Sequence, residues 1–228
     1  MSTVAVIPAR GGSKRLPRKN ILDLAGKPML AYAIETAHAS RLFDQVCVST
    51  EDADIARVAR EFGAAVIERP DSIAGDRSTV AQVCLHALEA LPSIDVFCCI
   101  YATAVLLKPE TLQASHALLE AEPKADYVMG VSRYEHPPVQ ALKADEAGYL
   151  TYMWPEWRGV QSQFQPDLVV SNGTFYWGRR QPFLADRTFY GSRLRGAVVP
   201  DDQVSDIDTE ADFRKVFDLI SGVEGRLK

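Results

Sequence analysis

The chain has 228 residues, of which 47% are hydrophobic and 24% are charged, a composition typical of a globular protein with one sizeable core. Its formal net charge of −5 argues against a broad basic surface for nucleic acid. No apolar run has the length of a membrane span, and the first residues lack the pattern of a signal peptide. We therefore expect a cytoplasmic protein with neither nucleic-acid nor membrane partners.

The four cysteines agree with this compartment. Cys47, Cys84, Cys98 and Cys99 lie in apolar segments, and their spacing matches no metal site. We expect them to be buried free thiols in a reducing cytoplasm.

The first predicted strand, Val4–Ile7, leads directly into a basic loop, Ala9–Asn20. Gly11 and Gly12 allow the backbone to turn sharply and to approach a ligand, and backbone N–H groups in such a loop can converge on an anion. The spacing matches neither a P-loop nor the dinucleotide fingerprint, because the two glycines are adjacent and a proline follows. A solvated basic turn is the alternative, but it does not explain the glycine pair. The loop therefore predicts a site for a nucleoside triphosphate, with five cations within ten residues: Arg10, Lys14, Arg15, Arg18 and Lys19.

Further apolar strands alternate with helical patterns along the next hundred residues. Continuous apolar strands separated by helices predict an α/β fold with a doubly wound, mostly parallel sheet. The predicted strands are Val46–Ser49, Ala64–Ile67, Val96–Ile100 and Tyr127–Val131, and the predicted helices are Met29–Ala39, Ile55–Phe62, Val80–Leu91 and Leu112–Glu120.

Two loops follow strands of this sheet at the edge where ligands usually bind. The segment Arg69–Thr79 reads either as a loop before an N-capped helix or as a pyrimidine site made by backbone groups and a hydroxyl. The segment Cys98–Ala104 ends in small residues that leave space, with Tyr101 and Thr103 as polar groups. A packed strand end is the alternative there.

The alternation stops after Ser132, where Glu135–Asn172 is rich in proline and aromatic residues and has a predicted turn at Glu146–Gly148. This stretch is either an insert with its own small core or an arm that packs on a second subunit, and aromatic enrichment favours the arm. Strand character resumes at Gly173–Trp177. A final strand is predicted at Val198-Val199 and a final helix over Glu210–Ile220.

Asp206-Ile207-Asp208 precedes that last helix. In extended backbone Ile207 would face the core, and both carboxylates would share one solvent pocket. Paired carboxylates without nearby His or Cys suit Mg²⁺, which is commonly held together with substrate phosphates. A helix cap is the alternative for Asp208 or Thr209, but Asp206 has no capping role at that spacing.

These motifs together resemble a known family. The stretch Ile7–Lys14 with Lys19-Asn20 resembles the opening motif of the cytidylyltransferases that activate nonulosonic (sialic-acid-like) sugars, and Asp206–Thr209 with Asp212 resembles their closing motif. The resemblance implies that CTP and an acidic nine-carbon sugar give a CMP-sugar and pyrophosphate, with Mg²⁺ as cofactor. It also implies a Rossmann-like fold of the nucleotide-diphospho-sugar transferase type, with a single domain over residues 1–228, an inserted dimerisation arm over residues 133–175 and a homodimer.

The resemblance and the charge pattern together imply roles for individual residues. Arg10, Lys14 and Lys19 would hold the phosphates, and Asp206 and Asp208 would hold Mg²⁺, which would lower the pKa of the sugar hydroxyl without a separate protein base. The implied nucleotide site comprises Ala9, Arg10, Gly11, Ser13, Lys14, Lys19, Asn20, Arg69, Ser78 and Thr79, and the implied sugar site comprises Tyr101, Thr103, Asn172 and Tyr176.

Within the family, Tyr101–Ala104 and Phe175–Gly178 resemble the pseudaminic acid branch, whereas the sialic acid branch typically has Gln at the place of Tyr101 and Pro at that of Val105. The chain departs from the pseudaminic pattern at Val105-Leu106, where Pro-Phe is usual, and at Ser171–Thr174, where His-Asp-Ala-Gly-Gln is more common. The flat face of Tyr101 favours a deoxygenated, pseudaminic-type acid. The same reaction on N-acylneuraminic acid, legionaminic acid or 3-deoxy-manno-octulosonate stays open, as does a nucleotide-binding module without turnover, against which the intact pair of aspartates argues.

Overall fold

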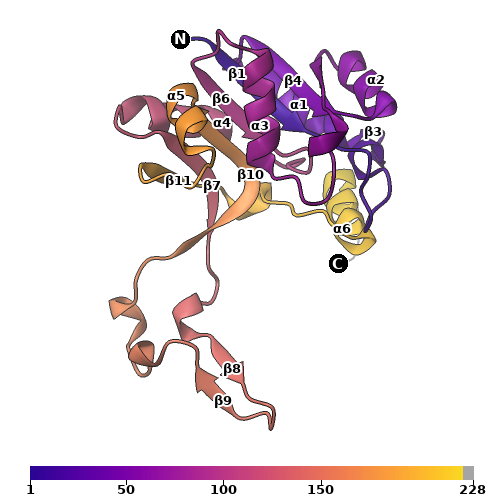
Figure 1. The fold of residues 1–228 in the computed structure, drawn as a ribbon. Helices are drawn as coiled ribbons and strands as arrows, with labels where there is room; N and C mark the ends of the chain where they lie inside the picture. The colour runs from indigo at the N-terminus through magenta and orange to yellow at the C-terminus, as the bar shows by residue number, and fades with distance from the viewer. Residues whose placement is uncertain (223–228) are drawn as a thin grey trace.

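A seven-stranded sheet with the order β11-β7-β10-β6-β1-β4-β5 forms the centre of the body in the computed structural model, which describes residues 1–222 (Figure 1). Strand β10 pairs antiparallel with both of its neighbours, and every other pairing in this sheet is parallel. The predicted α/β fold with a mostly parallel sheet is confirmed. The strands are β1 (Thr3–Pro8), β4 (Gln45–Thr50), β5 (Ala65–Glu68), β6 (Val96–Ile100), β7 (Tyr127–Arg133), β10 (Val169–Arg179) and β11 (Leu194–Val198).

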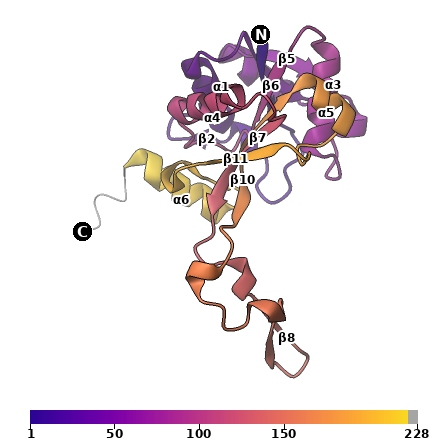
Figure 2. The same ribbon diagram turned by 90° about the vertical axis from the view of Figure 1, so that its left-hand side faces the viewer.

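Helices cover both faces of the sheet, as Figure 2 shows. Apolar side chains of α1 (Met29–Ser40), α2 (Ala53–Glu61) and α4 (Pro109–Ala121) pack in one core cluster with one face of the strands. Side chains of α3 (Val80–Ala90) and α5 (Arg180–Asp186) pack in a second cluster with the other face. The sheet is therefore doubly wound, and strands such as β1 and β6 are buried along almost their whole length because helices cover both faces.

The helix boundaries follow the local sequence. Pro28 precedes α1, and Pro109 occupies the first turn of α4, where a missing N–H costs nothing. Gly63 follows α2 with φ +83°, the left-handed conformation that glycine adopts without strain. The short helix α5 had no predicted counterpart, since Phe183 is its one buried residue.

A third apolar cluster joins the end of the chain to its beginning. Helix α6 (Glu210–Ser221) contributes Val216, which packs with Ile207 and with Leu16 of the basic loop. The short ladder of β2 (Asp23–Leu24) and β3 (Lys27–Pro28) lies beside this cluster and contributes Leu24. This packing brings the closing motif next to the opening one, although they are far apart in sequence.

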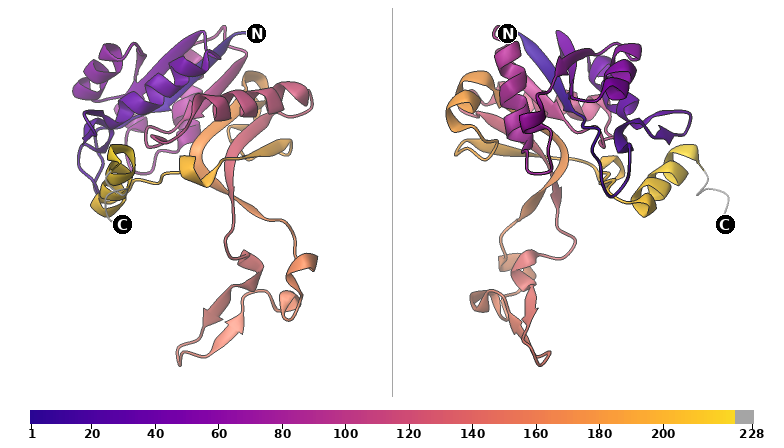
Figure 3. Two further views of the ribbon diagram at one scale, coloured as in Figure 1. Left: turned by 180° about the vertical axis from the view of Figure 1, so that it is seen from behind. Right: turned by 45° about the vertical axis from the view of Figure 1, so that its right-hand side comes forward.

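An arm leaves the body between β7 and β10 (Figures 1 and 3). It carries an antiparallel hairpin of β8 (Leu142–Ala144) and β9 (Leu150–Tyr152), whose turn contains Gly148 at φ +87° and confirms the predicted turn. Val139 is the one buried side chain between residues 134 and 168. The insert therefore has no core of its own, and that alternative reading of the sequence is wrong.

All four cysteines are buried and free, as predicted. Burial raises the pKa of Cys47 to about 11, so its thiol stays protonated near neutral pH. No helix within residues 1–222 is both long enough and apolar enough to span a bilayer.

Candidate functional site

A hollow of about 210 Å³ opens at the carboxyl ends of β1, β5 and β6, where the basic loop leaves the sheet. Three segments contribute side chains that the sequence marks as candidates. They are Arg10, Ser13, Lys19 and Asn20 from the loop, Arg69 and Ser78 from the segment after β5, and Tyr101 and Thr103 from the segment after β6. We call this cavity the loop hollow. Of the other predicted nucleotide-site residues, Ala9, Gly11 and Lys14 adjoin these in the chain, whereas Thr79 lines the neighbouring hollow described below.

Acidic groups at the end of β4 hold the loop in shape. The Gly11 N–H donates to Glu51 Oε1 at 2.7 Å, while Arg18 pairs with Asp52 at 2.9 Å and with Asp54 at 2.6 Å. A Cβ atom at Gly11 would collide with the Asp52 carboxylate, so this position requires glycine. Arg18 is thus engaged with the start of α2 and does not line the loop hollow.

Two buried polar residues at this hollow donate hydrogen bonds to backbone carbonyls. The buried Asn20 side chain donates from Nδ2 to the Arg10 carbonyl at 2.9 Å, which joins the two ends of the loop. The guanidinium of the buried Arg69 donates to the Ser49 carbonyl at 2.6 Å. Desolvation lowers the pKa of Arg69 from its ordinary high value, and the nearby Glu51 carboxylate opposes that shift.

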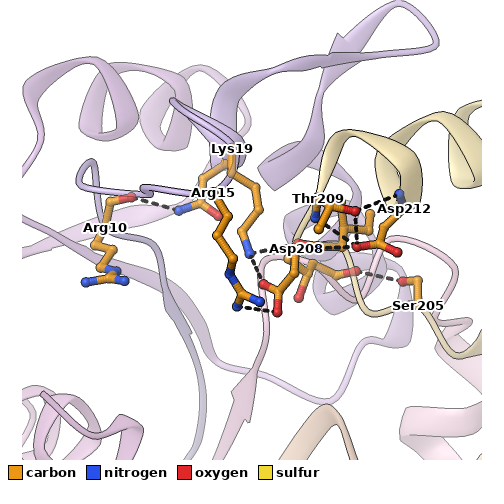
Figure 4. Close-up of polar contacts among 10 residues, drawn as sticks. Arg10, Arg15, Lys19, Ser205, Asp208, Thr209 and Asp212 are labelled. Atoms are coloured by element: carbon orange, nitrogen blue, oxygen red, sulfur yellow. Dashed lines mark hydrogen bonds and ion pairs between the residues drawn. The ribbon is translucent and has the colours of Figure 1, made fainter. Parts of the chain in front are cut away.

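The remaining loop cations pair with acids from distant segments. Asp76 bridges Arg10 and Lys14 with oxygen–nitrogen distances of 2.6 and 2.5 Å. Asp208 bridges Arg15 and Lys19 with distances of 2.5 and 3.0 Å, as Figure 4 shows. Lys19 Nζ also donates to the Ile207 carbonyl at 2.8 Å, so this lysine fixes the closing motif to the loop.

The closing motif differs in one respect from the expectation of a shared carboxylate pocket. Ile207 is fully buried, as predicted, and Asp208 faces the loop. Asp206 instead lines a separate hollow of about 190 Å³ that includes Asp212 and Lys215 but not Asp208. The two loop cations account for the difference, since they attract Asp208, whereas Asp206 has no ion pair within residues 1–222.

The cap of α6 is Thr209 and not Asp208. Thr209 Oγ1 accepts from the Asp212 N–H, and Asp212 Oδ2 accepts from the Thr209 N–H, which is a complete capping box. Asp208 is therefore free of the capping role.

No group of three or more His, Cys, Asp or Glu side chains within residues 1–222 is arranged to hold a metal ion alone. The carboxylate of Asp208 at the loop nevertheless suits Mg²⁺, which commonly takes one or two carboxylates and completes its coordination with substrate phosphates and water, whereas Asp206 lies in a separate hollow. The donor chemistry thus suits a metal that arrives with a nucleotide.

A second hollow, of about 350 Å³, adjoins the first and shares Val80 and Tyr101 with it. Its wall is aromatic. The rings of Tyr176 and Phe189 stack with centroids 4.9 Å apart, and those of Tyr101 and Tyr176 lie 5.7 Å apart. We call this cavity the aromatic hollow. Burial raises the pKa of Tyr101, so its hydroxyl is neutral near neutral pH.

Sequence patterns identified only part of this second hollow. Arg187, Phe189 and Tyr190 line it, yet they follow the unpredicted helix α5 and belong to no motif. The sequence offers one signal for these residues, the aromatic pair Phe189-Tyr190 shortly after Arg187, and it lies outside the predicted strands. Asn172, a predicted sugar residue, lines neither hollow. Its side chain instead accepts from Thr174 Oγ1 at 2.7 Å and donates to Ser132 Oγ at 3.2 Å.

Comparison with known proteins places the chain among nucleotidyl-transferring enzymes. A family model described as cytidylyltransferase matches residues 4–149. A pseudaminic acid cytidylyltransferase of Campylobacter jejuni is 35% identical over 227 residues, which cover 95% of this chain and 96% of the relative. A CMP-N,N'-diacetyllegionaminic acid synthase of Legionella pneumophila is 32% identical, with 93% of this chain and 94% of the relative covered.

A solved structure supports the fold. The chain superposes on a CMP:2-keto-3-deoxy-manno-octonic acid synthetase complexed with CTP with a TM-score of 0.75, 20% identity, and coverage of 98% of this chain and 100% of the other. At that identity the likeness shows a shared Rossmann-like architecture.

Proposed function

This chain belongs to the cytidylyltransferase family, and from that premise we propose that it transfers the cytidylyl group of CTP to a pseudaminic-acid-type sugar. The anomeric hydroxyl oxygen of the sugar forms a bond to the α-phosphorus of CTP. The bond from that phosphorus to the bridging oxygen breaks, pyrophosphate leaves, and the hydroxyl proton passes to solvent.

One observation carries this proposal: the loop hollow and the aromatic hollow meet at Tyr101 and Val80. A transfer reaction needs the acceptor hydroxyl beside the α-phosphorus. Cationic side chains surround the first hollow and apolar rings the second, so the nucleotide and the sugar occupy adjoining sites.

The loop supplies most of the positive charge that this reaction requires. Negative charge develops on the phosphoryl oxygens and on departing pyrophosphate, so positioned cations provide much of the catalysis. Arg10 and Lys19 line the loop hollow and hold the phosphates there, with Lys14 beside them in the loop. Ser78 and the backbone near Arg69, which border the same hollow, hold the base.

Mg²⁺ is the cofactor in this proposal. Asp208 would hold it next to the loop, and when bound it would neutralise phosphate charge. Asp206 lines a separate hollow, so its carboxylate would have to turn toward Asp208 to serve as a second ligand. Asp208 already lies against the loop through Lys19 and Arg15.

The aromatic hollow favours a sugar with apolar substituents. Tyr176 and Phe189 present ring faces to acylamino methyl groups, and Tyr101 offers a neutral hydroxyl at the junction of the two hollows. A polar sugar group left unpaired there costs about 1–3 kcal/mol, which lowers kcat/KM for that sugar roughly tenfold to a hundredfold. A pseudaminic-type acid is therefore preferred over N-acetylneuraminic acid.

We place the reaction in the cytoplasm, where CTP is made and where the four free thiols stay reduced.

We also propose a homodimer formed through the arm, because exposed apolar side chains concentrate there. Those of the arm and its base are Tyr134, Leu142, Tyr149, Leu150, Met153, Trp154, Phe164, Val169 and Val170.

Pyrophosphate release tests the proposed function. The protein is incubated with CTP and Mg²⁺ and with pseudaminic, legionaminic, N-acetylneuraminic or 3-deoxy-manno-octulosonic acid. We expect kcat/KM to be highest for pseudaminic acid. Equal values for pseudaminic and N-acetylneuraminic acid would show that Tyr101 does not select the sugar. Absence of release with every acid, despite binding of CTP, would instead favour a module without turnover.

A further inference from the structure

The carboxylate of Asp76 occupies an unusual position for a residue with no assigned role. It belongs to the segment between β5 and α3, which also contributes Ser78 to the loop hollow. Its Oδ1 lies 2.6 Å from Arg10 and its Oδ2 lies 2.5 Å from Lys14. Asp76 thus links two segments that border the same hollow.

Both of its partners belong to the loop whose charge the proposed reaction needs. Neither Arg10 nor Lys14 has another acidic partner within residues 1–222. One carboxylate that places each oxygen on a different cation uses the same contacts that two non-bridging oxygens of a phosphate would use. Hydrogen bonds from Lys14 and Arg10 also hold the pKa of Asp76 below its usual value, so it is negatively charged at neutral pH.

The contact is one that a nucleotide can replace at low cost. The side chain of Asp76 is 45% exposed and that of Lys14 is 80% exposed, so water screens the pair and solvates Asp76 after release. Gly75, the preceding residue, has open space where a side chain would lie, so no neighbouring group packs against the chain at that point. A triphosphate brings several negative charges to the same cations.

We propose that Asp76 is an internal competitor of the nucleotide phosphates, occupying Arg10 and Lys14 until CTP displaces it and thereby lowering the affinity for CTP. This inference rests on the proposed function, because it takes the loop hollow to be the CTP site. Asp76 would then determine the affinity for CTP without making a favourable contact with the bound nucleotide.

Equilibrium binding without a sugar acid tests the competition, since CTP is then not consumed. Calorimetric titrations with CTP and with cytidine compare the wild type, Asp76→Asn and Glu61→Gln. The control Glu61 forms a similar exposed pair with Arg57 at 2.7 Å on α2. We expect Asp76→Asn to lower the Kd of CTP about three- to tenfold and to leave that of cytidine within about twofold, because cytidine carries no phosphate to compete. Glu61→Gln leaves both unchanged.

Two results would overturn the inference while leaving the CTP site intact. An unchanged Kd for CTP in Asp76→Asn would show that no competition exists. A higher Kd would show that Asp76 helps to bind the nucleotide, by positioning Arg10 and Lys14 or by holding a cation. A wild-type protein that binds no CTP at all would overturn the proposed function itself, and the competition with it.

Discussion

At the scale of single residues, Lys19 is the point where the opening and closing motifs meet. Its ammonium group lies at the loop hollow, pairs with Asp208 and donates to the Ile207 carbonyl. Its side chain is 17% exposed, so it is not the solvated loop charge of the alternative interpretation of the sequence. Lys19 therefore contributes to the fold as well as to the charge of the site.

Lys19→Ala should lower kcat/KM about 100- to 1,000-fold, because one preorganised charge on the reacting phosphates is lost. It should also lower the free energy of unfolding by about 1 kcal/mol, because the bond to Ile207 disappears. Steady-state kinetics and urea denaturation measure the two effects.

Lys27→Ala is the matched control for Lys19→Ala, because Lys27 pairs with Glu35 and does not line the loop hollow. We expect its kcat/KM to stay within about twofold of the wild type. Near-normal turnover in Lys19→Ala would contradict the phosphate role of the loop.

Asp208→Asn should raise the Mg²⁺ concentration needed for half-maximal activity at least about tenfold, as expected for a weakened metal site. The amide keeps the shape of the side chain but removes its charge. Titration of activity against Mg²⁺ in the two proteins provides the measurement. Superimposable curves would eliminate the metal role.

Thr209→Ala separates this effect from helix capping, because Thr209 caps α6. The substitution should cost about 1 kcal/mol of stability and leave the Mg²⁺ requirement unchanged. A raised Mg²⁺ requirement in Thr209→Ala would mean that the two roles are not separable.

At the scale of elements, local patterns predicted the parallel half of the sheet and its helices. The expected strand Val96–Ile100 is β6 to the residue, and the expected helix Met29–Ala39 differs from α1 by one residue. These elements are predictable because short continuous apolar runs bounded by turn residues differ from the longer helical spacing of apolar residues. The shape of the basic loop is less predictable, because it depends on contacts such as Arg15–Asp208 and Arg10–Asp76 between distant positions.

The elements that local patterns missed have weak local signals. Helix α5 is seven residues long with one buried side chain, so it has little periodicity. The antiparallel direction of β10 leaves no trace in the apolar run Phe175–Trp177, because this run is buried between β6 and β7 like a parallel strand. The aromatic hollow depends on both elements, which explains why Phe189 had no predicted role.

At the scale of the whole molecule, the arm is the feature that sets the protein apart from a simple doubly wound domain. Its base is a regular pairing, in which Arg133 of β7 lies opposite Val169 of β10. Residues 134–168 therefore begin and end at neighbouring positions of two antiparallel strands, and the body does not need them to close its sheet.

Replacement of residues 134–168 by Asn-Gly, a sequence suited to a tight turn, should leave a folded body. We expect the wild type to sediment as a dimer with an interface above about 1,000 Å², and the shortened chain to sediment as a monomer. Sedimentation velocity at several concentrations and thermal unfolding test this.

Two outcomes would contradict the role of the arm in assembly. One is a shortened chain that still sediments as a dimer. The other is a wild type that is a fully active monomer at every concentration.

The position of β10 also determines when the sheet can be completed during synthesis on the ribosome. Strands β6 and β7 do not pair with each other, and β10 fills the gap between them. A nascent chain that ends before Val169 thus leaves the edges of β6 and β7 that pair with β10 open, and these edges are sites of misassociation until β10 emerges. The pairing of Phe175 with Ile100 closes a long stretch of chain, a step that is slow compared with local helix formation. Residues 4–149, which the family model matches, end before β10 and therefore lack the strand that joins β6 to β7.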